Sequence, residues 1–201
     1  MELEDFYKRG LWVTTRAGNI GAKKKYALLD KNNELKIRGF ETVRRDWCKL
    51  AREVQNKVLR MVLETGNHEK ALTYVKGIII KLKNREIPIE DLIIRTMLKK
   101  SLADYKAISP HVIAARKMKE LKLPIEDGGL IEYYISEPQS EIKKGKTLVR
   151  DRVKLVIEKG EYDIEYYLKN QVLPAVENIF QVFNININEI IDGKRQMKLG
   201  E

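Results

Sequence analysis

The segment TVRRDWCKLAREVQNKVLRMVLETG (residues 42–66) decides how this chain is organised. Its apolar residues recur at helical spacing and form one stripe: Trp47, Leu50, Ala51, Val54, Val58 and Val62. Thr42 is a residue type that caps helix starts, and Gly66 is one that ends helices. A different face carries the basic residues Arg45, Lys49, Arg52 and Arg60. The segment therefore predicts one long helix with a core side and a basic side.

The sequence before this helix predicts a small antiparallel β-meander. Three β-rich runs cover residues 11–14, 25–29 and 34–38. A turn is expected at Arg9-Gly10 and another over residues 30–33, and residues 16–21 form a connector or hairpin tip.

The sequence after Gly66 predicts further helices. Asn67 is expected to cap a second helix, and Pro88 to end that region. The apolar stripe of this second helix is Ala71, Val75, Ile78, Ile79 and Leu82. Ser109-Pro110 marks another helix start, because a hydroxyl cap is followed by proline at the first helical position.

The last part of the chain predicts a β-hairpin and a helix. Two strands are expected over residues 130–136 and 148–157, with a loop from Pro138 to Lys146 between them. A final helix is expected from Ile164 to Phe183, bent at Pro174.

The fold class is therefore α+β, a short antiparallel β segment followed by a mainly helical region with a late β-hairpin. We place the boundaries at residues 1–40, 41–183 and a flexible tail of 184–201.

The charge of the chain favours a polyanionic partner. The 201 residues carry 39 Lys and Arg against 29 Asp and Glu, a net charge of +10. Residues 1–60 hold 15 basic and 8 acidic residues, whereas residues 161–201 hold 4 and 7. A basic excess concentrated early in the chain indicates nucleic acid or an anionic surface, or else a solvated lysine-rich face. The acidic N-terminus and the lack of a long apolar run predict a soluble cytoplasmic protein with no membrane partner.

The sequence offers no reaction centre. His68 and His111 lack the spacing of metal ligands, and the single Cys48 excludes an internal disulfide. The acidic pairs Glu90-Asp91 and Glu126-Asp127 are adjacent, so their members cannot share one face of a helix. We therefore expect no catalytic residue, no metal ligand and no cofactor bound by this chain.

Three basic motifs are candidate nucleic-acid contacts. In Lys23-Lys24-Lys25-Tyr26, strand alternation sends Lys24 and Tyr26 to one face, and these residue types suit a phosphate backbone or protect a sheet edge. Arg44 and Arg45 open the long helix, where they meet phosphate or pair with Asp46.

The third motif places Tyr105 and Lys106 just before the Ser109-Pro110 helix start, with His111 in the first turn. A helix N-terminus beside a cation is an anion site, or else an ordinary capped helix.

Five motifs in order resemble the C-terminal third of archaeal-type family-B DNA polymerases. They are FYKRG (6–10), KKKYA (23–27), RGFETVRRDW (38–47), DYKAISPHV (104–112) and DIEYYLKNQVLPAV (163–176). The resemblance covers about residues 2–183. It implies that residues 1–40 complete a palm sheet and that residues 41–183 are a thumb.

The resemblance also implies roles by position. Lys23, Lys24, Lys25 and Tyr26 match a palm motif that touches the primer strand. Arg44 and Arg45 match the palm–thumb junction, and Tyr105, Lys106 and His111 match a thumb segment along the duplex.

The chain also departs from the family pattern. The metal-binding aspartates of such polymerases precede the motif at residues 6–10, so we expect this chain to be inactive alone. It resembles the small subunit of a split polymerase whose large subunit holds Mg²⁺, with primer–template DNA as the shared partner. The connector over residues 15–22 is longer than in the family, which affects the pose of the Lys-Lys-Lys-Tyr motif.

In the tail, Gln196 and Leu199 match the first half of a sliding-clamp-binding box. Two alternatives to the small subunit of a split polymerase remain. One is a stand-alone nucleic-acid-binding protein without a polymerase partner, and the other is an artificial polymerase fragment.

Overall fold

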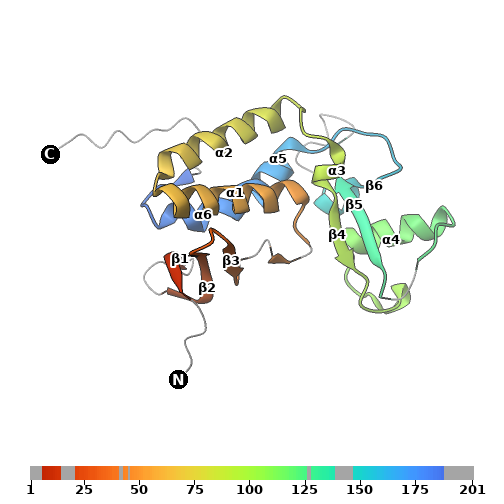
Figure 1. Ribbon diagram of the computed structural model, residues 1–201. Helices are drawn as coiled ribbons and strands as arrows, with labels where there is room; N and C mark the ends of the chain where they lie inside the picture. The colour runs from red at the N-terminus through yellow and green to blue at the C-terminus, as the bar shows by residue number, and fades with distance from the viewer. Residues whose placement is uncertain are drawn as a thin grey trace, which may run out of the picture.

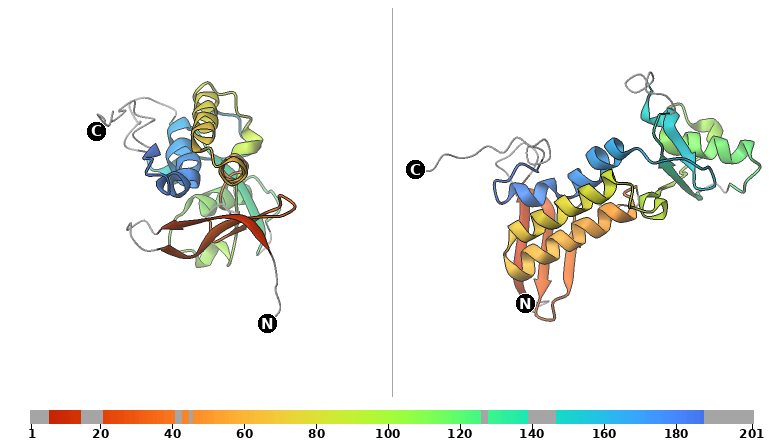
Figure 2. Two further views of the ribbon diagram at one scale, coloured as in Figure 1. Left: turned by 60° about the vertical axis from the view of Figure 1, so that its left-hand side comes forward. Right: turned by 90° about the horizontal axis from the view of Figure 1, so that it is seen from above.

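The computed structural model describes residues 6–14, 21–40, 43–44, 46–125, 128–138 and 147–187. Helices α1 (Lys49–Thr65) and α6 (Leu173–Gln181) pack on one face of an antiparallel sheet, and α2 (His68–Lys83) packs on α1 from the opposite side (Figures 1 and 2). A second sheet and α4 (Pro110–Glu120) form a separate lobe beyond the N-terminal end of α1 (Figure 1).

The first sheet has the order β1-β2-β3, with strands β1 (Tyr7–Thr14), β2 (Gly21–Asp30) and β3 (Leu35–Arg38). This confirms the predicted meander. The turn predicted at Arg9-Gly10 is wrong, because both residues lie inside β1 at a register shift that follows Tyr7. Arg9 instead ties the strand to α1, where its Nη1 donates to the carbonyls of Leu63 and Glu64 at 3.1 and 3.0 Å.

Helix α1 begins later than predicted. Its N-cap is Cys48, whereas the predicted cap, Thr42, and also Arg45 lie outside the described residues. The amide of Cys48 donates to Oε1 of Gln171 at 2.9 Å, so a distant side chain fixes where the helix starts. The end is as predicted: Gly66 adopts φ 72°, and Asn67 caps α2 by accepting from the amide of Lys70 at 2.9 Å.

The predicted core stripe of α1 is buried from Leu50 to Val62, with Trp47 half-buried before the helix. Two cations of the predicted basic face, Lys49 and Arg60, form surface ion pairs. Lys49 pairs with Asp91 at 2.7 Å, and Arg60 pairs with Glu64 at 3.0 Å. Surface pairs of this kind add little stability, but they reduce the charge that α1 presents to a polyanion.

The second sheet has the order β4-β5-β6, with strands β4 (Ile94–Met97), β5 (Leu130–Ile135) and β6 (Val153–Leu155). The late hairpin is confirmed, and β4 is an additional strand. The strand predicted over 148–157 is half wrong, because its first part is the 3₁₀ helix η4 (Val149–Arg152).

Short helices α3 (Ile89–Leu92) and η2 (Leu102–Asp104) flank β4. Of the predicted loop from Pro138 to Lys146, the structure describes only Pro138. The acidic pair Glu126-Asp127 also lies outside the described residues.

The final predicted helix consists of three pieces: α5 (Ile164–Tyr167), the π-helical η5 (Leu168–Val172) and α6. The π turn ends at Val172, and Pro174 lies in the first turn of α6, so the change of helix type precedes the proline at which a bend was predicted. The tail predicted to be loose beyond Asn184 is packed as far as Ile187, which is 1% exposed. Burial of the Ile187 side chain stabilises this packed position, although the surrounding residues are polar.

Gly39 lies too close to the backbone of β2 to carry a side chain, and its replacement tests this packing. It adopts φ 70°, and a Cβ there would lie 2.2 Å from the carbonyl oxygen of Lys24. We expect Gly39→Ala to lower the free energy of unfolding by about 2 kcal/mol or more, measured by urea denaturation. Gly77→Ala is the control: Gly77 lies inside α2 with open space around it, and this change should stabilise by up to about 1 kcal/mol. Equal effects of the two changes would contradict this account.

Candidate nucleic-acid interface

The Lys-Lys-Lys-Tyr motif lies in β2, and its members face different ways. Lys25 is 8% exposed, and its Nζ lies 5.3 Å from the ring centroid of Phe40. Lys24 is exposed at φ 63°, and Tyr26 is half-buried. Lys25 and Tyr26 differ in burial as the expected alternation predicts, but the positive φ of Lys24 and the register shift before Tyr26 interrupt the alternation at Lys24. Lys25 has a packing role that the sequence did not indicate. The side chain of Lys23 is outside the described residues.

Arg44 precedes α1 instead of lying in its first turn. Its Nη2 is 3.0 Å from Oδ2 of Asp46, and its side chain is 70% exposed. The Arg44 guanidinium is therefore accessible. The structure shows it in a surface pair with Asp46, which was the predicted alternative to a phosphate contact.

Tyr105 and His111 form one cluster at the start of α4. Their rings meet edge to face with centroids 5.6 Å apart, and the Tyr105 hydroxyl accepts the amide of Lys99 at 2.9 Å. Ser109 Oγ is 3.1 Å from Nδ1 of His111, and the Ser109 side chain does not cap the helix. Exposed Lys106 and the Lys100 ammonium, 5.0 Å from the Tyr105 ring centroid, bring positive charge to this helix N-terminus. The cluster is therefore suited to a phosphate.

The two groups of candidate residues lie in different lobes. Lys24 and Tyr26 belong to the first sheet, whereas Tyr105, Lys106 and His111 belong to the lobe of the second sheet and α4 (Figure 1). They do not converge on one pocket. An extended polyanion can contact both lobes, and a small anion cannot.

The pH dependence of stability reports on His111. Burial lowers the pKa of His111 below its ordinary value of 6.5, so the unfolded chain takes up this proton more readily. Stability is therefore expected to fall as the pH drops below about 6.5, and less so in His111→Phe, which keeps an aromatic ring beside Tyr105. Denaturation midpoints between pH 7.5 and 5.5 measure the effect. If the midpoints of the wild-type chain and of His111→Phe fell equally with pH, His111 would not be the source of the effect.

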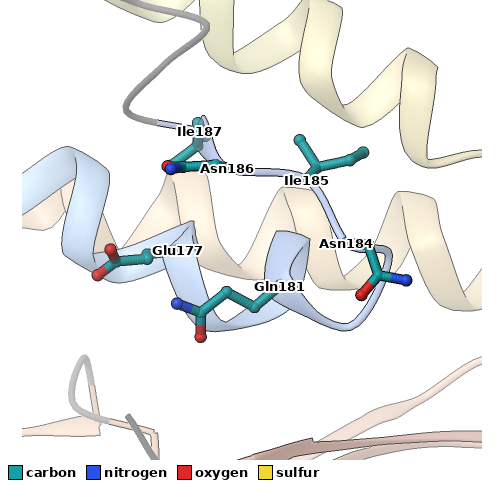
Figure 3. A pocket seen from close by; sticks show the side chains of 6 residues that line it. All are labelled: Glu177, Gln181, Asn184, Ile185, Asn186 and Ile187. Carbon is teal, nitrogen blue, oxygen red and sulfur yellow. The ribbon is translucent and has the colours of Figure 1, made fainter. Parts of the chain in front are cut away.

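A separate hollow lies at the end of α6 and has the wrong chemistry for a polyanion. It encloses about 400 Å³ between α6 and the segment that follows it (Figure 3). Its lining residues are Glu177, Gln181, Asn184, Ile185, Asn186 and Ile187. Its described lining has one acid and three amides and no lysine or arginine, so this hollow is not suited to a polyanion.

Comparison with known proteins decides the family. Residues 19–183 match the model of DNA polymerase family B. The chain belongs to this family. A DNA polymerase of Thermococcus gorgonarius is 39% identical over 205 residues, and one of Thermococcus kodakarensis is 41% identical over 187 residues. These alignments cover 100% and 91% of this chain, but only 25% and 10% of the relatives.

The fold agrees with this membership in family B. The structure of the family B DNA polymerase from Pyrobaculum calidifontis superimposes with a TM-score of 0.70 at 29% identity, covering 90% of this chain and 22% of that one. The predicted α+β class and the predicted resemblance to archaeal family-B polymerases are confirmed.

The described residues add two observations on sites. No three His, Cys, Asp or Glu side chains in this part of the chain gather as a metal site would require. No helix within it is long and apolar enough to cross a membrane. The tail residues Gln196 and Leu199 lie outside the described part, so the clamp-binding box stays a prediction.

Proposed function

We propose that this chain is the DNA-gripping palm and thumb portion of a family-B DNA polymerase and acts as the small subunit of a split enzyme. The observation that carries the proposal is the family match over residues 19–183. A larger polypeptide supplies the exonuclease, the fingers and the aspartates that hold Mg²⁺. Residues 1–40 complete its palm sheet, and residues 41–183 are the thumb.

The candidate residues support contact with the primer–template backbone. Lys24, Lys106 and Arg44 are exposed cations in the two lobes, and the α4 N-terminus adds backbone donors. Such groups bind phosphates and sugars, which carry no sequence information directly. The grip is therefore independent of sequence and weakens as salt rises.

The edges of the first sheet support docking to the larger polypeptide. Strands β1 and β3 are its two outer strands, and each pairs only with β2 within the described residues. An extended segment of a partner adds to such an edge through main-chain hydrogen bonds.

Reconstitution tests the proposal. The full chain is mixed with a candidate large subunit on primer–template DNA with Mg²⁺, and nucleotide incorporation is measured. We expect incorporation in the mixture and none from either chain alone, with the two chains co-eluting in gel filtration. A large chain that is fully active alone and elutes separately would favour the stand-alone nucleic-acid-binding protein instead.

A further inference from the structure

A row of three side chains crosses the face of the first sheet that points away from α1 and α6. Trp12 pairs in register with Tyr26, and Tyr26 pairs with Arg38, so the three lie on neighbouring strands. Trp12 is 63% exposed and Arg38 is exposed. Residues Leu11 and Val13 on either side of Trp12 are buried in the core, which fixes Trp12 on the outer face.

The indole lies against the sheet instead of extending away from it. A Cβ built on Gly10 would lie 2.5 Å from Cη2 of Trp12 and 2.9 Å from Cδ2 of Leu28. The ring therefore rests over Gly10 beside Leu28, and the absence of a Gly10 side chain makes this position available. The exposed surface of the indole is the 63% of Trp12 that solvent reaches on the outer face of the sheet.

Cations lie on the same face of the sheet as the indole. Arg38 ends the row, and Lys36 lies on the same face two positions before it, where its Nζ donates to the Tyr7 hydroxyl at 2.7 Å. Lys24 is exposed at the register shift of β2, on the strand that carries Tyr26. Two acids lie at the β2–β3 turn beside this face. Asp30 is turned into its own loop, where Oδ1 accepts the amides of Asn32 and Glu34 at 2.8 and 2.7 Å, and Glu34 is exposed two positions before Lys36. Aromatic and cationic side chains together match a nucleic-acid strand, whose bases stack while its phosphates pair with cations.

We propose that Trp12 is a stacking platform for an unpaired base of a DNA strand, with Arg38 and Lys24 binding the flanking phosphates. The inference rests on the proposed function, since it names a further DNA contact of the same chain. Bases inside a duplex cover each other's faces and present only their edges. The exposed surface of an indole that lies along the sheet therefore fits a base that has left the duplex, such as a frayed primer end.

Fluorescence of the full chain tests the stacking directly. The variant Trp47→Phe leaves Trp12 as the single tryptophan of the two in the sequence. Titration with a single-stranded oligothymidylate at low salt should quench the Trp12 emission, and a blunt duplex of the same length should quench it much less. Unchanged emission at saturating single strand would overturn the proposal.

Affinity measurements separate stacking from charge. Trp12→Ala should weaken single-strand binding by about 5- to 100-fold, whereas Trp12→Phe should keep most of it. Gly10→Ala should also weaken it, because the new methyl group displaces the ring. Lys76→Ala on the opposite side of the molecule, in α2, is the control and should leave the single-strand affinity within about twofold of wild type. Circular dichroism checks that each variant is folded.

Two outcomes would overturn this inference without touching the proposed function. Equal losses of single-strand and duplex affinity in Trp12→Ala would make the residue a general backbone contact. Normal single-strand binding with weaker association to the large chain would assign this face to the protein partner. Reconstituted incorporation by the wild-type chains tests the proposed function separately.

Discussion

Replacing Asp163 with alanine is expected to lower the free energy of unfolding by about 3–5 kcal/mol. The Asp163 carboxylate is buried, pairs with the guanidinium of Arg152, and accepts the amide of Tyr166 at 2.9 Å. Its loss leaves a largely buried cation without its partner and removes the cap of α5. Arg152 Nε already has no hydrogen-bond partner among the described residues. Urea denaturation at pH 7 measures the effect.

Glu165→Ala is the matched control for this prediction. Glu165 lies in the same helix and pairs with Lys169 at 2.5 Å, but both side chains are more than 60% exposed. Its removal should change stability by no more than about 0.5 kcal/mol. A loss below about 1 kcal/mol in Asp163→Ala would show that the buried pair does not hold this part of the fold together.

The double variant Lys24→Ala, Lys106→Ala is expected to weaken primer–template binding and to flatten its salt dependence. Each lysine that neutralises a phosphate releases counterions, so the slope of log affinity against log salt should fall by about 0.9 per lysine. Fluorescence anisotropy of a labelled duplex between about 50 and 200 mM salt measures both quantities. The reconstituted enzyme should also become less processive.

Lys70→Ala, Lys76→Ala removes the same charge from the exposed surface of α2, on the far side of α1 from the first sheet (Figure 1). This control should leave the salt slope unchanged. If it matched the effect of the first pair, DNA binding would depend on net charge and not on the two predicted sites. Lys25→Ala should act mainly on stability, because its ammonium packs over Phe40.

Much of the fold follows from local patterns in the sequence. The stripe from Leu50 to Val62, the glycine stop at Gly66 and the cap at Asn67 are all local signals, and the structure agrees with each. Strand β4 was not predicted, because four residues are too few to establish an alternation. The start of α1 was misplaced, because its cap partner Gln171 lies far along the chain.

The candidate site was predictable only in part. Side-chain alternation separated Lys25 from Tyr26, but it does not apply at Lys24, where φ is 63°. A lysine has no local signal for burial, so the packing of Lys25 on Phe40 was missed. Trp12 was also missed: the alternation of apolar side chains in residues 11–14 does not show which face is buried, and the structure buries Leu11 and Val13. The Tyr105–His111 contact depends on the path of the intervening loop, which periodicity does not define.

The hydrogen bond from Cys48 to Gln171 has a consequence for how the chain folds as it is synthesised. It joins residues separated by 123 positions, and the helix it starts lies at the centre of the core. Contacts of such long range form late and slow folding, because a large loop must close before they are gained. Until Gln171 leaves the ribosome, the first turn of α1 in the nascent chain lacks this hydrogen bond and should be frayed. The apolar stripe of α1 should then be accessible to chaperones.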